Sequence, residues 1–212
     1  GHIYEENLRV IWKYTDKDKI ENFALRFAQR EVPEKKKTRP GRKMKRFISG
    51  ITPKGRIFLD EGVKALANRF IAIDDEYSAV SGSIAERVGE ISVKNGYDVI
   101  FCYCPMKPKL QCEHIIIPEQ RLALMSVRSG HNINVEFDRI IHSKRFLYEG
   151  VKDRTSYLRF NRRLMRELTN ESVTALKDAK SVHDKLEKLY INAMDFPGLA
   201  KYSKKLCGEI FC

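Results

Sequence analysis

The stretch RFIAIDDEYSAVSGS, residues 69–83, decides the fold class of this chain. Its apolar first residues predict a buried strand at 69–73. Residues 83–95 have the pattern of a helix, and Gly96 provides a good C-terminal signal. A second apolar run predicts another strand at 97–103. Strand, helix and strand in this order predict a βαβ unit, in which a right-handed crossover joins two parallel strands.

Segments on both sides extend this α/β pattern. The sequence predicts two amphipathic helices within 8–30, a solvated arm at 31–41, a short helix at 59–66, strands at 114–117, 121–127 and 137–141, and helices at 157–168, 172–190 and 199–210. We therefore expect a three-layer α/β fold with a mostly parallel sheet and a C-terminal helical extension. The expected division is N-terminal helices with a basic arm at 1–45, an α/β core at 46–143, and a helical region at 144–212 that packs on the core.

Length and composition fit one main domain. The 212 residues are 42% hydrophobic, which is enough to bury one core. The longest uncharged stretch, 99–106, is too short to span a bilayer, and the N-terminus lacks a secretory pattern. Five cysteines without a framework spacing indicate reduced thiols. We expect a soluble cytoplasmic protein without disulfides and without membrane contact.

The turn after the first strand of a βαβ unit presents backbone N–H groups and the positive end of the next helix to a ligand. A nucleotide-binding loop needs glycines, a lysine and a Ser or Thr for Mg²⁺. The turn at 74–83 has one glycine, no lysine and three adjacent carboxylates. Each contact between a carboxylate and a triphosphate costs about 1 kcal/mol in water and about 4 kcal/mol at an effective dielectric of about 20. The sequence thus predicts a degenerate phosphate loop, formed by Asp74, Asp75, Glu76, Ser81, Gly82 and Ser83.

Two hypotheses describe this loop. In the first, one of the three acids lies where a phosphate would bind and neutralises the helix end. In the second, the acids are solvated loop residues and Ser81 or Ser83 is an ordinary helix cap. No cofactor is expected, with a non-standard nucleotide and Mg²⁺ as the alternative.

Four segments carry a family resemblance: ITPKG at 51–55, YCP at 103–105, IIIPE at 115–119 and, above all, HDKLEKLYINAMDF at 183–196. Together with the βαβ unit, they resemble a family of bacterial ATPase-like P-loop proteins found mainly in spore-forming Firmicutes. Its members look like two tandem copies of such a unit, and this chain is similar to one copy over about 46–211. The resemblance implies a P-loop NTPase-like fold. The family's Gly-rich loop falls by position on 74–83, where only Ser81 or Ser83 matches the Mg²⁺-side hydroxyl and nothing matches the lysine.

Residues near the predicted strand ends are candidates for chemistry. Glu113, His114 and Glu119 flank the expected ligand crevice of an open α/β sheet, where they would serve as acid–base or metal-orienting groups. On the helix at 172–190, His183 stands beside acidic residues, and a packing or capping role is favoured over catalysis.

A zinc site is the alternative use of the cysteines. Cys102, Cys104 and Cys112, with His114, could form a tetrahedral set. Their spacing differs from that of the usual paired-cysteine turn, so buried or incidental thiols are favoured and no metal is expected.

Basic residues dominate the charge of +12. They gather in the arm and at 157–168, and the candidate basic surface is Lys35, Lys36, Lys37, Arg39, Arg42, Lys43, Lys45, Arg46, Arg159, Arg162, Arg163 and Arg166. Interleaved aromatic residues would suit stacking on single-stranded nucleic acid. Another protein domain, such as the other half of a tandem protein, is the competing partner.

These observations favour a degenerate P-loop NTPase-like domain with a structural or regulatory role, in which nucleotide binding is lost or non-standard. We do not expect an active NTPase from this chain by itself. The first alternative is an ATP-binding or ATPase domain whose site another domain completes. The second is a basic nucleic-acid-binding module.

Overall fold

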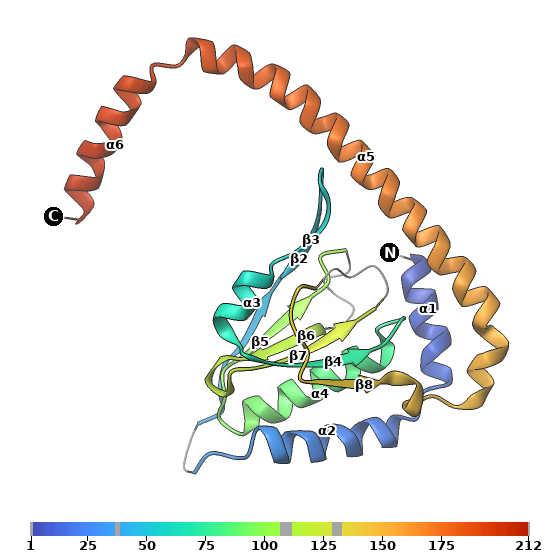
Figure 1. Ribbon diagram of the computed structural model, residues 1–212. Coiled ribbons are helices and arrows are strands. Elements are labelled where there is room, and N and C mark those ends of the chain that lie inside the picture. The colour runs from blue at the N-terminus through green and yellow to red at the C-terminus, as the bar shows by residue number, and fades with distance from the viewer. Residues whose placement is uncertain (1, 37–38, 107–111, 129–132, 212) are drawn as a thin grey trace.

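A computed structural model describes residues 2–36, 39–106, 112–128 and 133–211, and its centre is a six-stranded sheet (Figure 1). The strand order is β1-β5-β6-β7-β4-β8, and β6 alone runs against the other five strands. The bounds are β1 Lys43–Arg46, β4 Arg69–Asp74, β5 Val99–Tyr103, β6 Cys112–Ile117, β7 Leu122–Val127 and β8 Arg139–His142. The α/β class with a mostly parallel sheet is therefore confirmed.

The expected βαβ unit is β4, α4 (Ala79–Lys94) and β5. Its two strands are parallel, but β6 and β7 lie between them. The reversal of β6 follows from the short 3₁₀ turn Pro118–Gln120, which ends at Arg121 with φ of 51° and leads directly into β7. Sequence patterns report elements and not their neighbours, so this insertion could not be predicted.

Helices and loops cover both faces of the sheet and make three layers. On one face lie α4 and α2 (Lys17–Glu31), whose Phe23 and Phe27 share a core cluster with β4, β5, β6 and β7. The α4 helix comes so close that a Cβ on Gly89 would lie 2.5 Å from ring atoms of Phe101. On the other face lie α3 (Asp60–Leu66), the hairpin of β2 (Ser49–Thr52) and β3 (Gly55–Phe58), and apolar residues of 133–137.

The N-terminal part differs from the expected division. The two predicted helices are present as α1 (His2–Lys13) and α2, and α2 belongs to the core. Strand β1 begins at Lys43, inside the segment that we assigned to the arm, and forms one edge of the sheet. The arm is thus shorter than expected because its last residues pair with β5.

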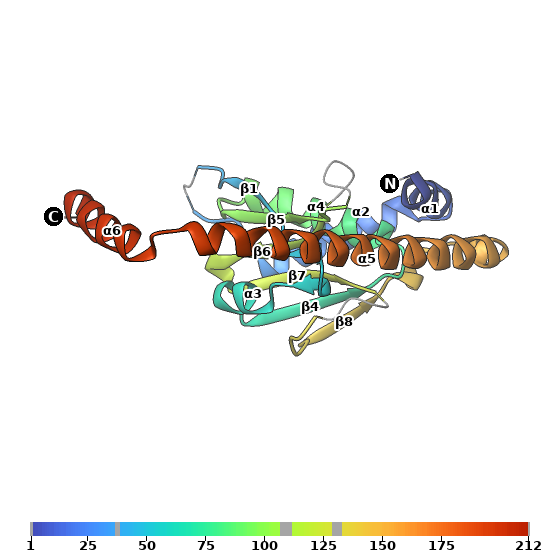
Figure 2. The ribbon, with the colours of Figure 1, turned by 90° about the horizontal axis from the view of Figure 1, so that it is seen from above.

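The C-terminal part is one long helix, α5 (Thr155–Ala193), followed by α6 (Phe196–Phe211). We expected separate helices that pack on the core, but α5 buries side chains near its start and further along contacts only the tip of the β2–β3 hairpin among the described elements. Leu158 and Asn161 are its buried residues, whereas residues 193–210 are all exposed. Figures 1 and 2 show α5 running along the outside of the core and α6 extending beyond it. No proline or glycine interrupts 155–193, so nothing local ends the helix. Among the described helices, none is both long enough and apolar enough to cross a membrane.

Candidate functional site

The candidate site lies where β4 and β7 end. These neighbouring strands are parallel, but the segments that follow them lead to opposite faces of the sheet. After β4 the chain enters α4, which packs on one face, whereas residues 133–137 after β7 pack on the other face. In open α/β sheets, such a divergence at the carboxyl ends of the strands creates a ligand-binding crevice. Because β6 is reversed, its first residues reach the same edge.

Asp75 is the central residue of the loop after β4. It is 2% exposed, and its Oδ2 accepts a hydrogen bond of 2.8 Å from the backbone N–H of Ser81. Its Oδ1 accepts a longer bond of 3.3 Å from the N–H of Tyr77. Ser78, with φ of 60°, turns the chain so that α4 begins above this carboxylate. Burial raises the pKa of Asp75, and the backbone N–H donors oppose that rise.

The neighbouring acids turn outward and each meets a basic side chain. Asp74 lies 3.0 Å from Nδ1 of His142 at the end of β8. Glu76 forms an ion pair of 2.6 Å with Arg162 on α5. The three adjacent carboxylates therefore have three different environments, and only Asp75 faces the helix end.

The small residues of the loop do not cap the helix with their side chains. The hydroxyl of Ser81 is buried and lies 2.8 Å from that of Ser126 on β7. Ser83 donates a hydrogen bond of 2.7 Å to the carbonyl of Ala79, one turn earlier. The helix begins at Ala79 and not at the predicted Ser83, and Gly82 lies within its first turn. The hypothesis that Ser81 or Ser83 is the cap is therefore wrong: the N-cap residue is Ser78, and the side chain that accepts an N–H of the first turn is that of Asp75.

A buried ion pair faces the loop from the other strands. Arg128 follows β7, and its Nη2 lies 3.2 Å from Oε1 of Glu113 on β6. Their side chains are only 10% and 2% exposed. Arg128 also donates to Oγ of Ser78 at 3.2 Å and lies over the ring of Tyr4.

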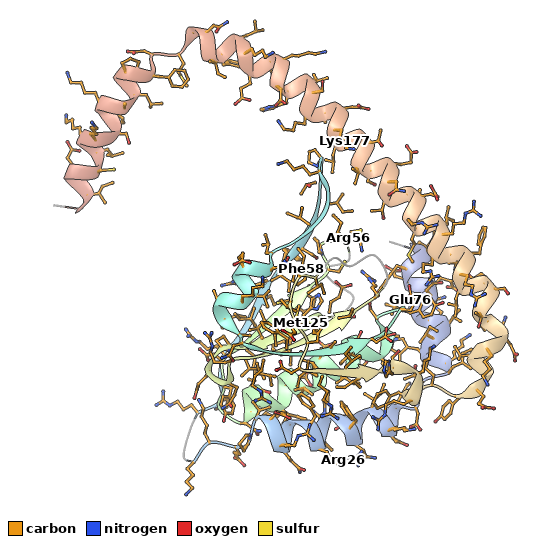
Figure 3. All side chains as sticks on the ribbon, in the orientation of Figure 1. Arg26, Arg56, Phe58, Glu76, Met125 and Lys177 are labelled. Atoms are coloured by element: carbon orange, nitrogen blue, oxygen red, sulfur yellow. The ribbon has the colours of Figure 1, made fainter. Side chains whose placement is uncertain are left out.

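The charge of Arg128 affects the pKa of two further side chains, Tyr4 and Arg56. Burial raises the pKa of Tyr4, which donates a hydrogen bond to the carbonyl of Tyr77, and Arg128 opposes the rise. On β3, burial and the nearby Arg128 lower the pKa of Arg56. Figure 3 shows Arg56 between the hairpin and the core, with Glu76 on the side of α1. The edge therefore brings two guanidinium groups near one buried carboxylate.

Our comparisons with known protein families, curated proteins and solved structures find no match to this chain. The site must be interpreted from its own geometry.

The predicted crevice residues separate in the structure. Glu113 is part of the buried pair, and His114 is also buried, with Nδ1 accepting a bond of 3.1 Å from the N–H of Ser126. Glu119, in contrast, lies past the far end of β6, where it pairs with Lys35. The prediction that Glu119 belongs to the crevice is wrong. His114 lies near the start of β6, at the crevice, whereas Glu119 follows the end of β6, on the opposite side of the sheet along the strand direction.

The cysteines do not form the zinc set considered above. Cys102 packs on the face of α3, whereas Cys112 packs on the face of α4. Burial raises the pKa of Cys102 to about 12. The Sγ of Cys112 donates to the carbonyl of His114 at 2.9 Å, so both residues are structural thiols.

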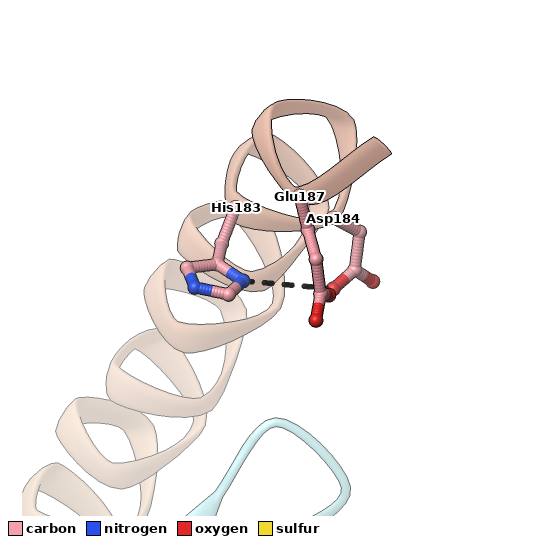
Figure 4. Close-up of side chains that lie close together, drawn as sticks. All are labelled: His183, Asp184 and Glu187. Atoms are coloured by element: carbon pink, nitrogen blue, oxygen red, sulfur yellow. Dashed lines mark ion pairs between the residues drawn. The ribbon is translucent and has the colours of Figure 1, made fainter. Parts of the chain in front are cut away.

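One cluster among the described residues has the geometry of metal ligands, and it lies on α5. Atoms of His183, Asp184 and Glu187 lie within 4.8 Å of one another (Figure 4). The ring of His183 is 71% exposed, and the residue lies inside α5 away from both ends, so the expected packing or capping role is wrong. Both carboxylate oxygens of Asp184 already accept from Lys180 at 2.7 Å. The cluster is a solvated helix surface.

The basic residues form two separate groups. In the arm, Lys35 and Arg42 pair with Glu119 and Asp98. On β1, Lys43 and Lys45 lie over the rings of Phe101 and Tyr103 of β5. Lys36, Arg39 and Arg46 belong to this group, and Lys37 lies outside the described residues. The second group, on α5, lies beside the loop after β4 and comprises Arg159, Arg162, Arg163 and Arg166.

Sequence reasoning missed Arg128, Arg56, Ser78 and Tyr4. A signal existed for Arg128, because it comes directly after a predicted strand, as Asp74 does, and for Ser78, which lies within the turn at 74–83. Arg56 and Tyr4 reach the edge through tertiary contacts.

Proposed function

We propose that this chain is a degenerate P-loop NTPase-like domain with a structural or regulatory role, in which Asp75 takes the position of a phosphate. The observation that carries the proposal is the hydrogen bond of 2.8 Å from the N–H of Ser81 to the buried carboxylate of Asp75. At the N-terminus of a helix after a parallel strand, such N–H groups are the usual phosphate donors. Here the N–H groups of Ser81 and Tyr77 donate to the carboxylate of Asp75 in the same chain.

Charge adds to this obstruction. A micromolar nucleotide affinity corresponds to about 8 kcal/mol of binding free energy. A contact between a phosphate and Asp75, the acid that faces the helix end, would cost about 1 to 4 kcal/mol, depending on the local dielectric. The loop also has no lysine to offset this repulsion. Retention of the usual nucleotide affinity is therefore not expected.

The experiment compares wild type with Asp75→Ala, using inorganic phosphate and fluorescent ATP with Mg²⁺ as probes. We expect no saturable binding to wild type. In Asp75→Ala, the N–H groups of Ser81 and Tyr77 become available, so phosphate should raise its melting temperature. Asp74→Ala is the matched control, since it removes an exposed carboxylate of the same charge without freeing these N–H groups.

Two outcomes would contradict the proposal. Saturable micromolar ATP binding by wild type would show that the loop is not disabled. A phosphate effect that is the same in Asp75→Ala and Asp74→Ala would show that Asp75 does not stand in for phosphate.

A nucleic-acid-binding role is the second candidate. Arg159, Arg163 and Arg166 are exposed on the first turns of α5, and the ring of Phe160 beside them is 64% exposed. Guanidinium groups next to an exposed aromatic ring suit single-stranded nucleic acid. A mobility shift that weakens steeply with salt, and that Arg163→Glu abolishes, would support this role. No shift at physiological salt would exclude it.

A further inference from the structure

The outer face of α5 carries an apolar stripe that nothing in the described structure covers. Its positions are spaced alternately by four and three residues: Leu168, Ser172, Ala175, Ala179, Val182, Leu186, Leu189 and Ala193. Leu168, Val182, Leu186 and Leu189 are 52%, 66%, 49% and 69% exposed. This spacing is the a/d pattern of a coiled coil and extends for about 38 Å of helix, with Ser172 as the one polar residue among the eight positions.

The stripe points away from the rest of the chain. Lys177 and Lys188 line a groove with Pro53, at the tip of the β2–β3 hairpin, so this side of α5 faces the core. Figure 3 shows Lys177 beside the hairpin tip. A helix turns about 100° per residue, so positions nine residues apart lie on opposite sides. Leu168 and Leu186 are each nine residues from Lys177, and the core of the same chain cannot cover them.

We propose that α5 pairs with α5 of a second copy of this chain as an antiparallel two-stranded coiled coil. The register that places Ala179 opposite Val182 of the second copy also pairs large residues with small ones throughout. Leu189 then meets Ser172, Leu186 meets Ala175, and Leu168 meets Ala193. Such alternation fills the interface without voids.

The charged residues that flank the stripe support the same register. In an antiparallel pair, the positions before each a residue face one another, which places Asp178 opposite Lys185 of the second copy, twice by symmetry. In a parallel pair, Asp178 would face His183 and Lys185 would face Tyr190. In a parallel pair, each layer contains the same residue from both copies. Three successive layers would then contain only Ser172, Ala175 and Ala179, and these small side chains would leave space unfilled. Both charge and size therefore favour the antiparallel arrangement.

The second copy fits this surface better than α6 does. Asp195 accepts bonds from the N–H groups of Gly198 at 2.9 Å and Leu199 at 3.0 Å, which fixes the start of α6 directly after α5. α6 has an exposed apolar side of its own, with Leu199, Leu206 and Ile210. Its sixteen residues are too few to cover the whole stripe. If α6 folded back on α5, the chain would remain a monomer.

The test is the mass of the full chain by sedimentation equilibrium, with variants that address the stripe and the flanking charges. Wild type should have the mass of two copies. Leu186→Glu should raise the dimer dissociation constant by about 100-fold or more, because it places a charge in an apolar layer. Ser181→Glu is the matched control, since it adds the same charge on the groove side of the same helix, and it should leave the dimer intact.

Charge exchange tests the register. Lys185→Asp alone should weaken the dimer several-fold, because two carboxylates then face each other at each of two positions. The double variant Asp178→Lys with Lys185→Asp should restore the wild-type constant, which the parallel arrangement does not predict. A monomer at all concentrations, a dimer that Leu186→Glu leaves unchanged, or no restoration in the double variant would overturn the proposal. Melting of the core should be unchanged in Leu186→Glu, because the stripe does not touch the core.

Discussion

The buried pair of Arg128 and Glu113 allows a quantitative test of whether the edge of the sheet is desolvated. Replacing Arg128 by methionine keeps the aliphatic part of the side chain and removes the charge. The Glu113 carboxylate, only 2% exposed, then loses a partner at 3.2 Å that water cannot readily replace. Breaking a buried ion pair in this way typically costs about 3 to 5 kcal/mol.

The assay is urea unfolding and thermal melting of a double-mutant cycle of Arg128→Met, Glu113→Leu and the double variant. For a chain of this size, about 1 kcal/mol lowers the melting temperature by about 2 to 4 °C, so Arg128→Met should lower it by about 6 to 20 °C. The double variant should be more stable than Arg128→Met alone, because it does not leave the Glu113 carboxylate buried without Arg128. Its remaining loss of about 1 kcal/mol would come from the bond of Arg128 to Ser78.

Additive single losses below about 1 kcal/mol would refute this reasoning, because exposed pairs have that strength. The edge would then be hydrated, and Arg128 would be available to a ligand. A coupling energy above about 2 kcal/mol would show instead that the pair acts as a unit.

Three other predictions concern single residues. Because burial raises the pKa of Asp75, ionising it costs folding free energy, so wild type should lose stability relative to Asp75→Asn as the pH rises from about 4, which urea unfolding across pH would measure. A gain in wild-type stability over that range would contradict the shift. Gly89→Ala should destabilise the chain by up to about 2 kcal/mol, since overpacking against Phe101 costs about 1 to 3 kcal/mol and the helix propensity gained offsets about 1 kcal/mol; thermal melting would test this. A rise in melting temperature would show that the ring moves aside. In native protein, Cys207 should react with iodoacetamide and Cys102 should not, because Cys102 is buried and its pKa is raised to about 12; mass spectrometry of the labelled peptides checks this, and equal labelling would contradict it.

Local patterns predicted the elements of the core, and tertiary contacts supplied what the patterns could not. The run at 69–73 and the helix ended by Gly96 are local signals, and both elements are present. The same sequence showed three acids in a loop but not which one turns inward. That choice depends on Ser78 in the left-handed region and on packing of Val80 and Ile84 against the sheet. The insertion of β6 and β7 between β4 and β5 is equally non-local.

The sequence predicted only those residues of the candidate site that lie beside local patterns. Asp75 and Glu113 were named because they follow or precede apolar runs. Glu119 was grouped with Glu113 because the length and direction of β6 were unknown. Glu113 lies at the start of β6 and Glu119 after its end, so the strand separates the two carboxylates. Arg56 reaches the site from a hairpin on the other face, and no spacing in the sequence relates it to Arg128.

The attachment of α5 shows which contacts determine the position of the C-terminal helices. Arg162 pairs with Glu76, but the two side chains are 45% and 32% exposed, so this pair contributes about 1 kcal/mol or less. Leu158 is 1% exposed and packs with Leu8 and Ile11 of α1, and each such side chain contributes about 1.5 to 3 kcal/mol when buried. The apolar contact with α1 is therefore the stronger anchor. Because this anchor lies at the first turns, the stripe beginning at Leu168 stays free along the rest of α5, and pairing with a second copy would not disturb the loop that holds Asp75.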